Sequence, residues 1–351
     1  MKVLFVITGF GYGDTMRMKA LINELRQKAK DFRVMILGYE HSYNYFHKKY
    51  LTLKMGGYSF PDRGLEFKPT PFIARNLLLP AKWASTWLEH KTAITRFEPD
   101  CVISDFEPLG IIIGKKLNKP VISVFAYDPE LYKSYPHKTM SLNLQAKYLE
   151  TLYKASTEVF IPSFTKYGNS ENYHYIPPIV KRDEKALADD KALMKKLGLK
   201  KKPILVMLGG SNYGIKLAEK IRKSIPKYNE DFIFFGAKKQ LPTHHYLFKY
   251  NFLEYLKVSK ALITLGGNLT LAEALTFKKP TLAFPIKDHV EQVLNVYALK
   301  DIVMEGDPDT AEKSVATFLR KLDYYTEQIK KTNINTNGAA ILAQYLLKQY
   351  P

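Results

Sequence analysis

Residues 264–295 combine groups that bind anions with groups that bind hydroxyls. A strand that ends at Leu265 turns through Gly266 and Gly267, and a helix follows from about Asn268. Paired glycines let the backbone approach a ligand closely, and a helix N-terminus offers N–H groups to an anion. The loop after the next strand carries further polar side chains that can bind hydroxyl groups. These are Asp288, His289, Glu291, Gln292 and Asn295. The segment therefore predicts a site for a ligand with both negative charge and hydroxyl groups.

The loop 9–17 follows the first predicted strand and opens a helix. Gly9 and Gly11 fit a dinucleotide-binding G-x-G-x-x-G pattern, but Asp14 occupies the third glycine position, where its carboxylate repels a pyrophosphate. This departure argues against a dinucleotide site. Asp14 can instead cap the helix through its free N–H groups.

The elements that must position these residues form two series of strands. Each strand run is apolar throughout, without the alternation of apolar and polar residues that a half-exposed strand shows. Amphipathic helical patterns such as 15–28 lie between these runs, which predicts parallel sheets between layers of helices. The first-series runs are 3–8, 33–37, 101–104, 121–125 and 158–161, and the second-series runs are 204–208, 232–235, 261–265 and 281–284.

The chain therefore reads as two doubly wound α/β domains, with a boundary near 178–185. We expect an N-terminal domain over 1–180, a second domain over 181–335, and a last helix within 336–351 that packs back on the first domain. Ligands of such domains lie at the carboxyl ends of the strands, so facing domains would share a cleft.

Taken whole, residues 264–295 resemble the donor-binding signature of GT-B glycosyltransferases, the superfamily of MurG-like enzymes and UDP-sugar transferases. The resemblance is strongest over 203–300 and more diffuse over 1–180. It implies the GT-B fold, with an acceptor-binding N-terminal domain and a C-terminal domain that binds the nucleotide sugar. The site residues that it implies for the donor are Gly209, Gly210, Ser211, Phe252, Leu253, Gly266, Gly267, Asn268, Thr270, Glu273, Glu291, Gln292 and Asn295.

The roles that the resemblance implies differ among these residues. Gly267 and Thr270 would position the diphosphate, Glu273 would bind the ribose hydroxyls, and Glu291 with Gln292 would bind the hexose, supported by Asn295. Residues 209–211 resemble a loop that faces the donor phosphates, and residues 251–253 take the place of the uracil-binding loop.

In the acceptor domain, the resemblance makes Asp14 the general base and Asp105 its supporting residue, with Gly11, Gly13 and Thr15 in the acceptor loop. If Asp14 and Asp105 both face the cleft, their like charges would raise one pKa toward neutrality. Many relatives carry a histidine base at this point, so Asp14 is a departure. His41 and His137 are the alternative bases. The family implies a metal-independent reaction without a cofactor, in which helix N-termini and basic groups stabilise the leaving diphosphate.

Both tryptophans of the chain, Trp83 and Trp87, lie four residues apart in a helical segment with Arg75, Lys82 and Lys91 nearby. Tryptophan beside basic residues suits a membrane–water interface and a lipid-linked acceptor. The alternative is a helix that packs its tryptophan face into the core.

The bulk composition narrows the class of protein. The 351 residues carry 53 basic and 34 acidic side chains, a net charge of +19, which favours a polyanionic partner such as nucleic acid, an anionic membrane or a phosphorylated substrate. Cys101 is the single cysteine, so no internal disulfide can form. No apolar run is long enough to span a bilayer and the N-terminus lacks a signal-peptide pattern, so we expect a cytoplasmic protein, with association at the inner face of the membrane an open interpretation.

The leading functional hypothesis is an inverting hexosyltransferase. It would move N-acetylglucosamine or glucose from a UDP-sugar to a lipid-linked or cell-surface glycan acceptor. The alternatives are a nucleotide-sugar epimerase of the same fold and a non-catalytic nucleotide- or glycan-binding protein. A nucleic-acid binder is disfavoured because the basic residues are scattered and no recognition motif occurs.

Overall fold

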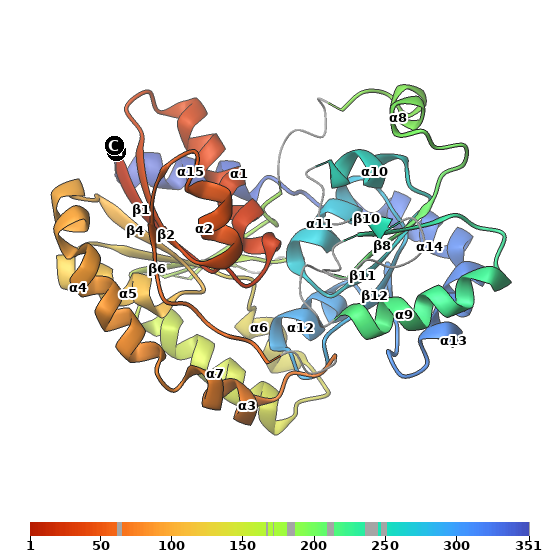
Figure 1. Ribbon diagram of the computed structural model, residues 1–351, viewed down its shortest axis with the longest axis horizontal. Helices are drawn as coiled ribbons and strands as arrows, with labels where there is room; N and C mark the ends of the chain where they lie inside the picture. Colours follow the sequence, from red (N-terminus) through yellow and green to blue (C-terminus); the bar gives the residue numbers. More distant parts are fainter. Residues whose placement is uncertain are drawn as a thin grey trace. The chain divides into compact units, whose positions relative to one another are not determined.

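The computed structural model describes residues 1–61, 65–165, 168–170, 172–180, 187–208, 214–235, 245–246 and 251–350. The chain divides into two compact units (Figure 1). Unit 1 comprises residues 1–61, 68–181 and 337–351, and unit 2 comprises residues 62–67 and 182–336. The short segment 62–67 thus belongs to unit 2 although the chain on both sides of it belongs to unit 1, which differs from the single expected boundary.

The sheet of unit 1 is parallel throughout. Its strands are β1 (Lys2–Ile7), β2 (Arg33–Gly38), β3 (Leu51–Lys54), β4 (Cys101–Asp105), β5 (Val121–Val124), β6 (Glu158–Pro162) and β7 (Tyr173–Ile176). Within the described residues the order is β3-β2-β1-β4-β5-β6-β7. From β1 the chain adds β2 and β3 on one side of the sheet, and β4 and the later strands then follow on the other side. The loops after β1 and β4 therefore diverge and leave a place for a ligand at the carboxyl ends of these strands.

Helices cover both faces of this sheet. They are α1 (Tyr12–Lys28), α2 (Glu40–Phe46), α3 (Pro69–Asn76), α4 (Leu79–Phe97), α5 (Pro108–Leu117), α6 (Pro129–Ser134), α7 (Met140–Lys154) and α15 (Gly338–Gln349). Helix α1 begins three residues before the predicted start at residue 15, because the loop after β1 is shorter than expected.

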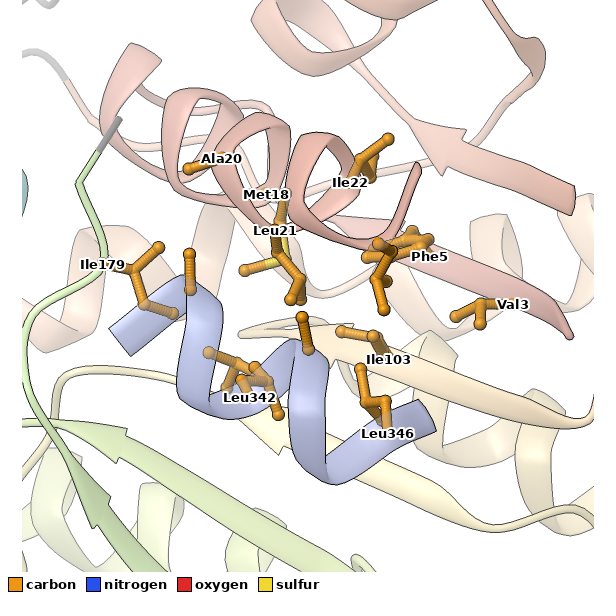
Figure 2. Packing of buried hydrophobic residues seen from close by; sticks show 14 of the residues in the cluster. Val3, Phe5, Met18, Ala20, Leu21, Ile22, Ile103, Ile179, Leu342 and Leu346 are labelled. Carbon is orange, nitrogen blue, oxygen red and sulfur yellow. The ribbon is translucent and has the colours of Figure 1, made fainter. Parts of the chain in front are cut away.

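Alternate residues of β1 enter different cores, as the two-residue period of a strand requires. Val3, Phe5 and Ile7 pack in one cluster with α1 and α15, whereas Leu4 and Val6 pack in another with α4 and α5. Figure 2 shows α15 lying beside α1, with apolar side chains of both helices filling the space between them. The C-terminal helix is therefore part of the unit 1 core.

Unit 2 repeats this architecture. Its strands are β8 (Ile204–Met207), β9 (Phe232–Phe235), β10 (His245–Tyr246), β11 (Ala261–Leu265), β12 (Thr281–Phe284) and β13 (Val303–Glu305). Among described residues they pair in parallel in the order β10-β9-β8-β11-β12-β13. Its helices are α8 (Asp190–Leu197), α9 (Ile215–Ser224), a 3-10 turn (Ile225–Lys227), α10 (Phe252–Val258), α11 (Asn268–Thr276), α12 (Val290–Ala298), α13 (Ala311–Arg320) and α14 (Leu322–Lys331). Here the order reverses between β8 and β11, so the turn after β11 lies at the expected ligand position.

Candidate functional site

The turn after β11 joins the centre of the second sheet to α11. Strand β11 ends at Leu265, Gly267 is the N-cap of α11, and the helix begins at Asn268. The first-turn N–H groups of a helix lack intrahelical acceptors and lie at the positive end of the helix dipole. A glycine N-cap brings no side chain that could satisfy them. The turn therefore has the geometry that the predicted anion site requires.

The two glycines of this turn have different surroundings. A Cβ atom on Gly266 would lie 2.7 Å from the carbonyl oxygen of Gln292 and 2.9 Å from its Cβ, so packing alone requires glycine there. A Cβ atom on Gly267 would meet no heavy atom within 4 Å. The backbone of Gly267 is thus open to a ligand, and packing does not require glycine at this position.

Two side chains of α12, Gln292 and Asn295, form hydrogen bonds that hold the glycine turn in place. The Gln292 Oε1 atom accepts hydrogen bonds from the backbone N–H groups of Gly266, at 3.2 Å, and Ile286, at 3.0 Å. The Asn295 Nδ2 atom donates to the Gly266 carbonyl at 3.1 Å, and its Oδ1 accepts from Asn268 at 3.3 Å. Because both backbone groups of Gly266 are bonded to α12, the turn and the polar loop form one connected structure.

This network changes the expected role of Gln292. Its carboxamide oxygen already accepts two backbone hydrogen bonds, so the NH2 group is the part of the side chain that can donate to a ligand. Asn295 is 5% exposed and positions the turn. Glu291 accepts a long hydrogen bond from Asn295, at 3.4 Å. On α11, Thr270 is half-buried and Glu273 is 9% exposed.

The remaining predicted donor residues fall into two groups. Residues 209–211 lie outside the described residues. Phe252 and Leu253 begin α10 and face the core of unit 2, where the Phe252 ring meets the edge of Phe235 at a centroid distance of 5.3 Å. Their side chains therefore belong to the core rather than to a nucleobase site, because these helix positions face the apolar residues of β9.

A further element of this region had no counterpart in the sequence reasoning. Residues 65–67 lie against the loop before α12: the Phe67 N–H donates to the Lys287 carbonyl and the Lys287 N–H donates to the Leu65 carbonyl, both at 2.7 Å. The Phe67 ring packs edge-on against His289. Burial lowers the pKa of His289 to about 4, so this imidazole is neutral at pH 7. A three-residue segment without periodicity gives no sequence signal for such pairing.

In unit 1, the first two turns of α1 and the end of β4 bring Asp14, Arg17 and Asp105 together. The Arg17 Nη2 atom donates to Asp14 Oδ1 at 2.5 Å and also to Asp105 Oδ1. Arg17 and Asp105 are buried, whereas the Asp14 side chain is about a quarter exposed, at 24%. The two predicted carboxylates therefore meet through an arginine rather than directly.

The structure also corrects the cause of the pKa shift expected for Asp14. Burial raises the pKa of Asp14 above its usual value, and the adjacent Arg17 guanidinium opposes that rise. Repulsion from Asp105 is not the source, because Arg17 stands between the two carboxylates. Asp14 is not the helix cap either: α1 begins at Tyr12 with Gly11 as its N-cap, so Asp14 lies in the first turn.

Glu107, two residues after Asp105, is a site residue that the sequence reasoning missed. It is fully buried, and burial raises its pKa well above the usual value. The hydroxyls of Thr8 and Tyr39 approach this carboxyl and offset part of the rise, although neither oxygen has a partner at full hydrogen-bonding geometry in the described chain. The turn to Glu107 passes through Phe106, whose φ of 56° is uncommon for a non-glycine residue. The sequence signal that could have indicated Glu107 is its position two residues after Asp105, at the end of a buried strand.

The other predicted acceptor-side residues lie in three separate parts of unit 1. Gly11 and Gly13 are half-buried at the start of α1, but Thr15 is fully buried and faces the core, so its side chain is not exposed to an acceptor. His41, in α2, lies tilted against Tyr12, with ring centroids 4.1 Å apart, which places it beside the start of α1. His137 is exposed in the segment before α7, where it contacts Tyr135.

The two tryptophans of α4 face inward. Both are partly buried against the apolar cluster beneath β1, β2 and β4, and the Trp83 Nε1 atom donates to the Gly56 carbonyl at 3.1 Å. The pair therefore forms the packed face of its helix, which was the alternative interpretation. None of the described helices combines the length and apolar character needed to cross a bilayer.

The described part of the chain holds no group of three or more His, Cys, Asp or Glu side chains arranged to bind a metal ion.

Comparisons with known proteins identify the family of this chain and its fold. Residues 1–323 match a family model described as glycosyl transferase family 1. An uncharacterized glycosyltransferase of Methanosarcina mazei is 24% identical over 336 residues, which cover 86% of this chain and 84% of that protein. A UDP-N-acetylglucosamine--N-acetylmuramyl-(pentapeptide) pyrophosphoryl-undecaprenol N-acetylglucosamine transferase of Clostridium tetani is 25% identical over 281 residues, or 74% of each chain.

Among solved structures, MurG of Acinetobacter baumannii superimposes with a TM-score of 0.62 at 15% identity, covering 99% of both chains. At this identity the likeness establishes the fold, which is that of the GT-B class.

Proposed function

The chain belongs to glycosyl transferase family 1, and from this membership we propose that it is an inverting hexosyltransferase. Its donor would be a UDP-sugar, with N-acetylglucosamine or glucose as the sugar, and its acceptor a lipid-linked or cell-surface glycan. The observation that carries the proposal is the glycine turn of unit 2, where Gly267 is open to a ligand while Gln292 and Asn295 fix the turn around it. The UDP-N-acetylglucosamine named for the clostridial relative supports the choice of donor.

In this proposal unit 2 binds the donor. The diphosphate lies against the N-terminus of α11, where the first-turn N–H groups and the helix dipole stabilise negative charge. Glu273 accepts hydrogen bonds from the ribose hydroxyls. Glu291 accepts from hexose hydroxyls, and the Gln292 NH2 group donates to them. Because His289 is neutral, charge on the leaving diphosphate is stabilised by the helix N-terminus rather than by this side chain.

Unit 1 supplies the base. The acceptor hydroxyl oxygen forms a bond to the anomeric carbon as the bond from that carbon to the diphosphate oxygen breaks. The proton of the hydroxyl passes to Asp14, and the bonding electron pair leaves with UDP. Asp14 suits this role because it is partly exposed and its raised pKa brings it closer to neutrality than an ordinary aspartate.

Contact with a membrane surface would bring a lipid-linked acceptor to unit 1. With Trp83 and Trp87 facing inward, the exposed apolar side chains of α3, α4 and the turn between them are the candidates for this contact. They are Ile73, Leu77, Leu78 and Leu88. Exposed Arg75, Lys82 and Lys91 belong to the same helices and complement anionic lipid headgroups. This placement corresponds to a cytoplasmic protein at the inner face of the cell membrane.

The experiment that tests the function follows labelled sugar into lipid. Purified protein is incubated with UDP-[14C]GlcNAc or UDP-[14C]glucose and a total polar and polyprenyl lipid extract, in EDTA. We expect label in the organic phase and, by NMR of the product, a β anomeric linkage. Asp14→Asn is the matched control, because it should bind donor and transfer no sugar. A retained α linkage, or equal transfer by the variant, would contradict the mechanism.

A further inference from the structure

Arg17 is buried to a degree that is unusual for arginine. Its side chain is 3% exposed, and arginine is almost never fully buried unless it is paired. A single nitrogen, Nη2, donates to Oδ1 of both Asp14 and Asp105. Burying a guanidinium costs several kcal/mol of desolvation, and apolar replacements of such buried networks are often more stable. Stability alone therefore gives a weak reason for an arginine at this position.

The contacts of Arg17 connect the sheet to the partly exposed carboxylate. Asp105 is the last residue of β4 and pairs in register with Ile7 of β1, so its position is fixed by the sheet. Arg17 lies one helical turn after Asp14 on α1. The order of contacts thus runs from the rigid strand end through a buried guanidinium to Asp14, which is the one member of the three with substantial exposure.

We propose that Arg17 is a positioning residue for the base: it fixes Asp14 by Oδ1 and so leaves Oδ2 to take the proton of the acceptor hydroxyl. This inference deepens the proposed function and rests on Asp14 as the base. Asp105 acts on the base through Arg17 rather than by direct contact. The base is then an aspartate held by an arginine, in place of the directly supported base that the sequence suggested.

The charges around Asp14 come from several elements. Arg17 contributes a positive charge from α1, and Asp105 a negative charge from β4. Burial raises the pKa of Glu107, at the N-cap of α5, well above its usual range. From α2, the His41 ring lies tilted against the ring of Tyr12. The arginine is thus the positive group in direct contact with Asp14, and it opposes the rise in the Asp14 pKa that burial causes.

Two substitutions should move the Asp14 titration in opposite directions. Arg17→Gln removes the positive charge that favours the carboxylate, so the Asp14 pKa rises. Asp105→Asn removes the negative charge that the guanidinium shares, so Arg17 acts more strongly on Asp14 and the pKa falls. An arginine neighbour typically shifts an aspartate by about one unit or more, a tenfold change in its ionisation constant. Arg17→Lys keeps the charge and should restore most of the wild-type value.

The test is a 13C NMR titration of protein labelled at the aspartate carboxyl carbons, with the Asp14 signal assigned from its absence in Asp14→Asn. We expect a midpoint at least about one pH unit higher in Arg17→Gln, near wild type in Arg17→Lys, and lower in Asp105→Asn. An unchanged Asp14 midpoint in folded Arg17→Gln would overturn the proposal. If that variant does not fold, the double variant Arg17→Gln/Asp105→Asn leaves no buried charge unpaired, and its midpoint should still lie above wild type because the closer group has been removed.

The titration separates this inference from the proposed function because it needs no turnover. UDP affinity and transfer are measured on the same samples. A raised midpoint with lost transfer and normal UDP affinity in Arg17→Gln supports both. A raised midpoint in a protein that transfers no sugar, even as wild type, keeps Arg17 as the group that holds Asp14 and refutes the transferase proposal.

Discussion

Replacing Gly267 with alanine separates ligand binding from folding at the donor turn. The new methyl group would meet no protein atom within 4 Å, and the backbone at φ −69° and ψ 135° is allowed for alanine. The free energy of unfolding should therefore change by less than about 1 kcal/mol, since the weaker N-cap and the stiffer unfolded chain act in opposite directions. The methyl group would instead occupy space that the diphosphate needs.

The expected loss of affinity follows from the hydrogen bonds at stake. A hydrogen bond to a charged group contributes about 1.5–3 kcal/mol. Losing one such bond between a first-turn N–H and a phosphate oxygen would weaken UDP binding by about ten- to hundredfold.

Gly266→Ala is the matched control. Its methyl group would lie 2.7 Å from the Gln292 carbonyl oxygen, so the turn or α12 must shift. Overpacking of this kind typically costs about 1–3 kcal/mol, and the variant should show a lower Tm even without ligand.

Differential scanning fluorimetry and isothermal titration calorimetry with UDP measure the two effects. The reasoning is refuted if Gly267→Ala binds UDP with wild-type affinity, or if it loses as much stability as Gly266→Ala.

Three further predictions concern the proposed base Asp14, the hydrogen bonds by which Gln292 holds the glycine turn, and the exposed apolar side chains between α3 and α4. Asp14→Asn should lower kcat by about 10²–10⁴-fold with UDP affinity retained. Wild-type kcat/KM should fall as the pH drops through the raised pKa of Asp14, because the base must be deprotonated. A wild-type kcat/KM that stays constant toward acid pH in folded protein would contradict this. Gln292→Ala should lower Tm and weaken UDP-sugar binding together, since it leaves the Gly266 and Ile286 N–H groups without their acceptor. An unchanged Tm by fluorimetry would argue that Gln292 does not hold the glycine turn. Leu77→Ser/Leu78→Ser should reduce co-sedimentation with anionic phosphatidylglycerol vesicles severalfold, whereas Leu51→Ser, which changes an exposed leucine on β3, should not. Equal losses in the two variants would show that Leu77 and Leu78 have no special role in membrane contact.

The central strands and the donor turn were predictable from sequence for a physical reason. Strands such as 232–235, 261–265 and 281–284 are buried on both faces, so their apolar runs are continuous and their ends are sharp. Strands β3, β10 and β13 lie at sheet edges and lack such runs, so they escaped prediction. The order of glycines, Glu273 and Gln292 along the chain likewise carries a long, specific pattern.

Side-chain partners were less predictable than elements. Nothing in the spacing of Asp14 and Asp105 indicates that Arg17 lies between them, because that contact depends on how α1 packs on β4. The helical pattern alone allows Trp83 and Trp87 to face either lipid or the protein core. In the structure both pack against the apolar cluster under the sheet. Phe252 was assigned to a ligand by its place in the chain, whereas its helix phase directs it toward Phe235.

Isothermal titration calorimetry of UDP against the wild-type protein and Glu273→Ala, in EDTA, tests the central claim most directly. The account predicts saturable one-site binding to the wild type that is lost in a folded Glu273→Ala variant. Absence of UDP binding to the folded wild type, or undiminished binding to the variant, would contradict the donor site described for unit 2.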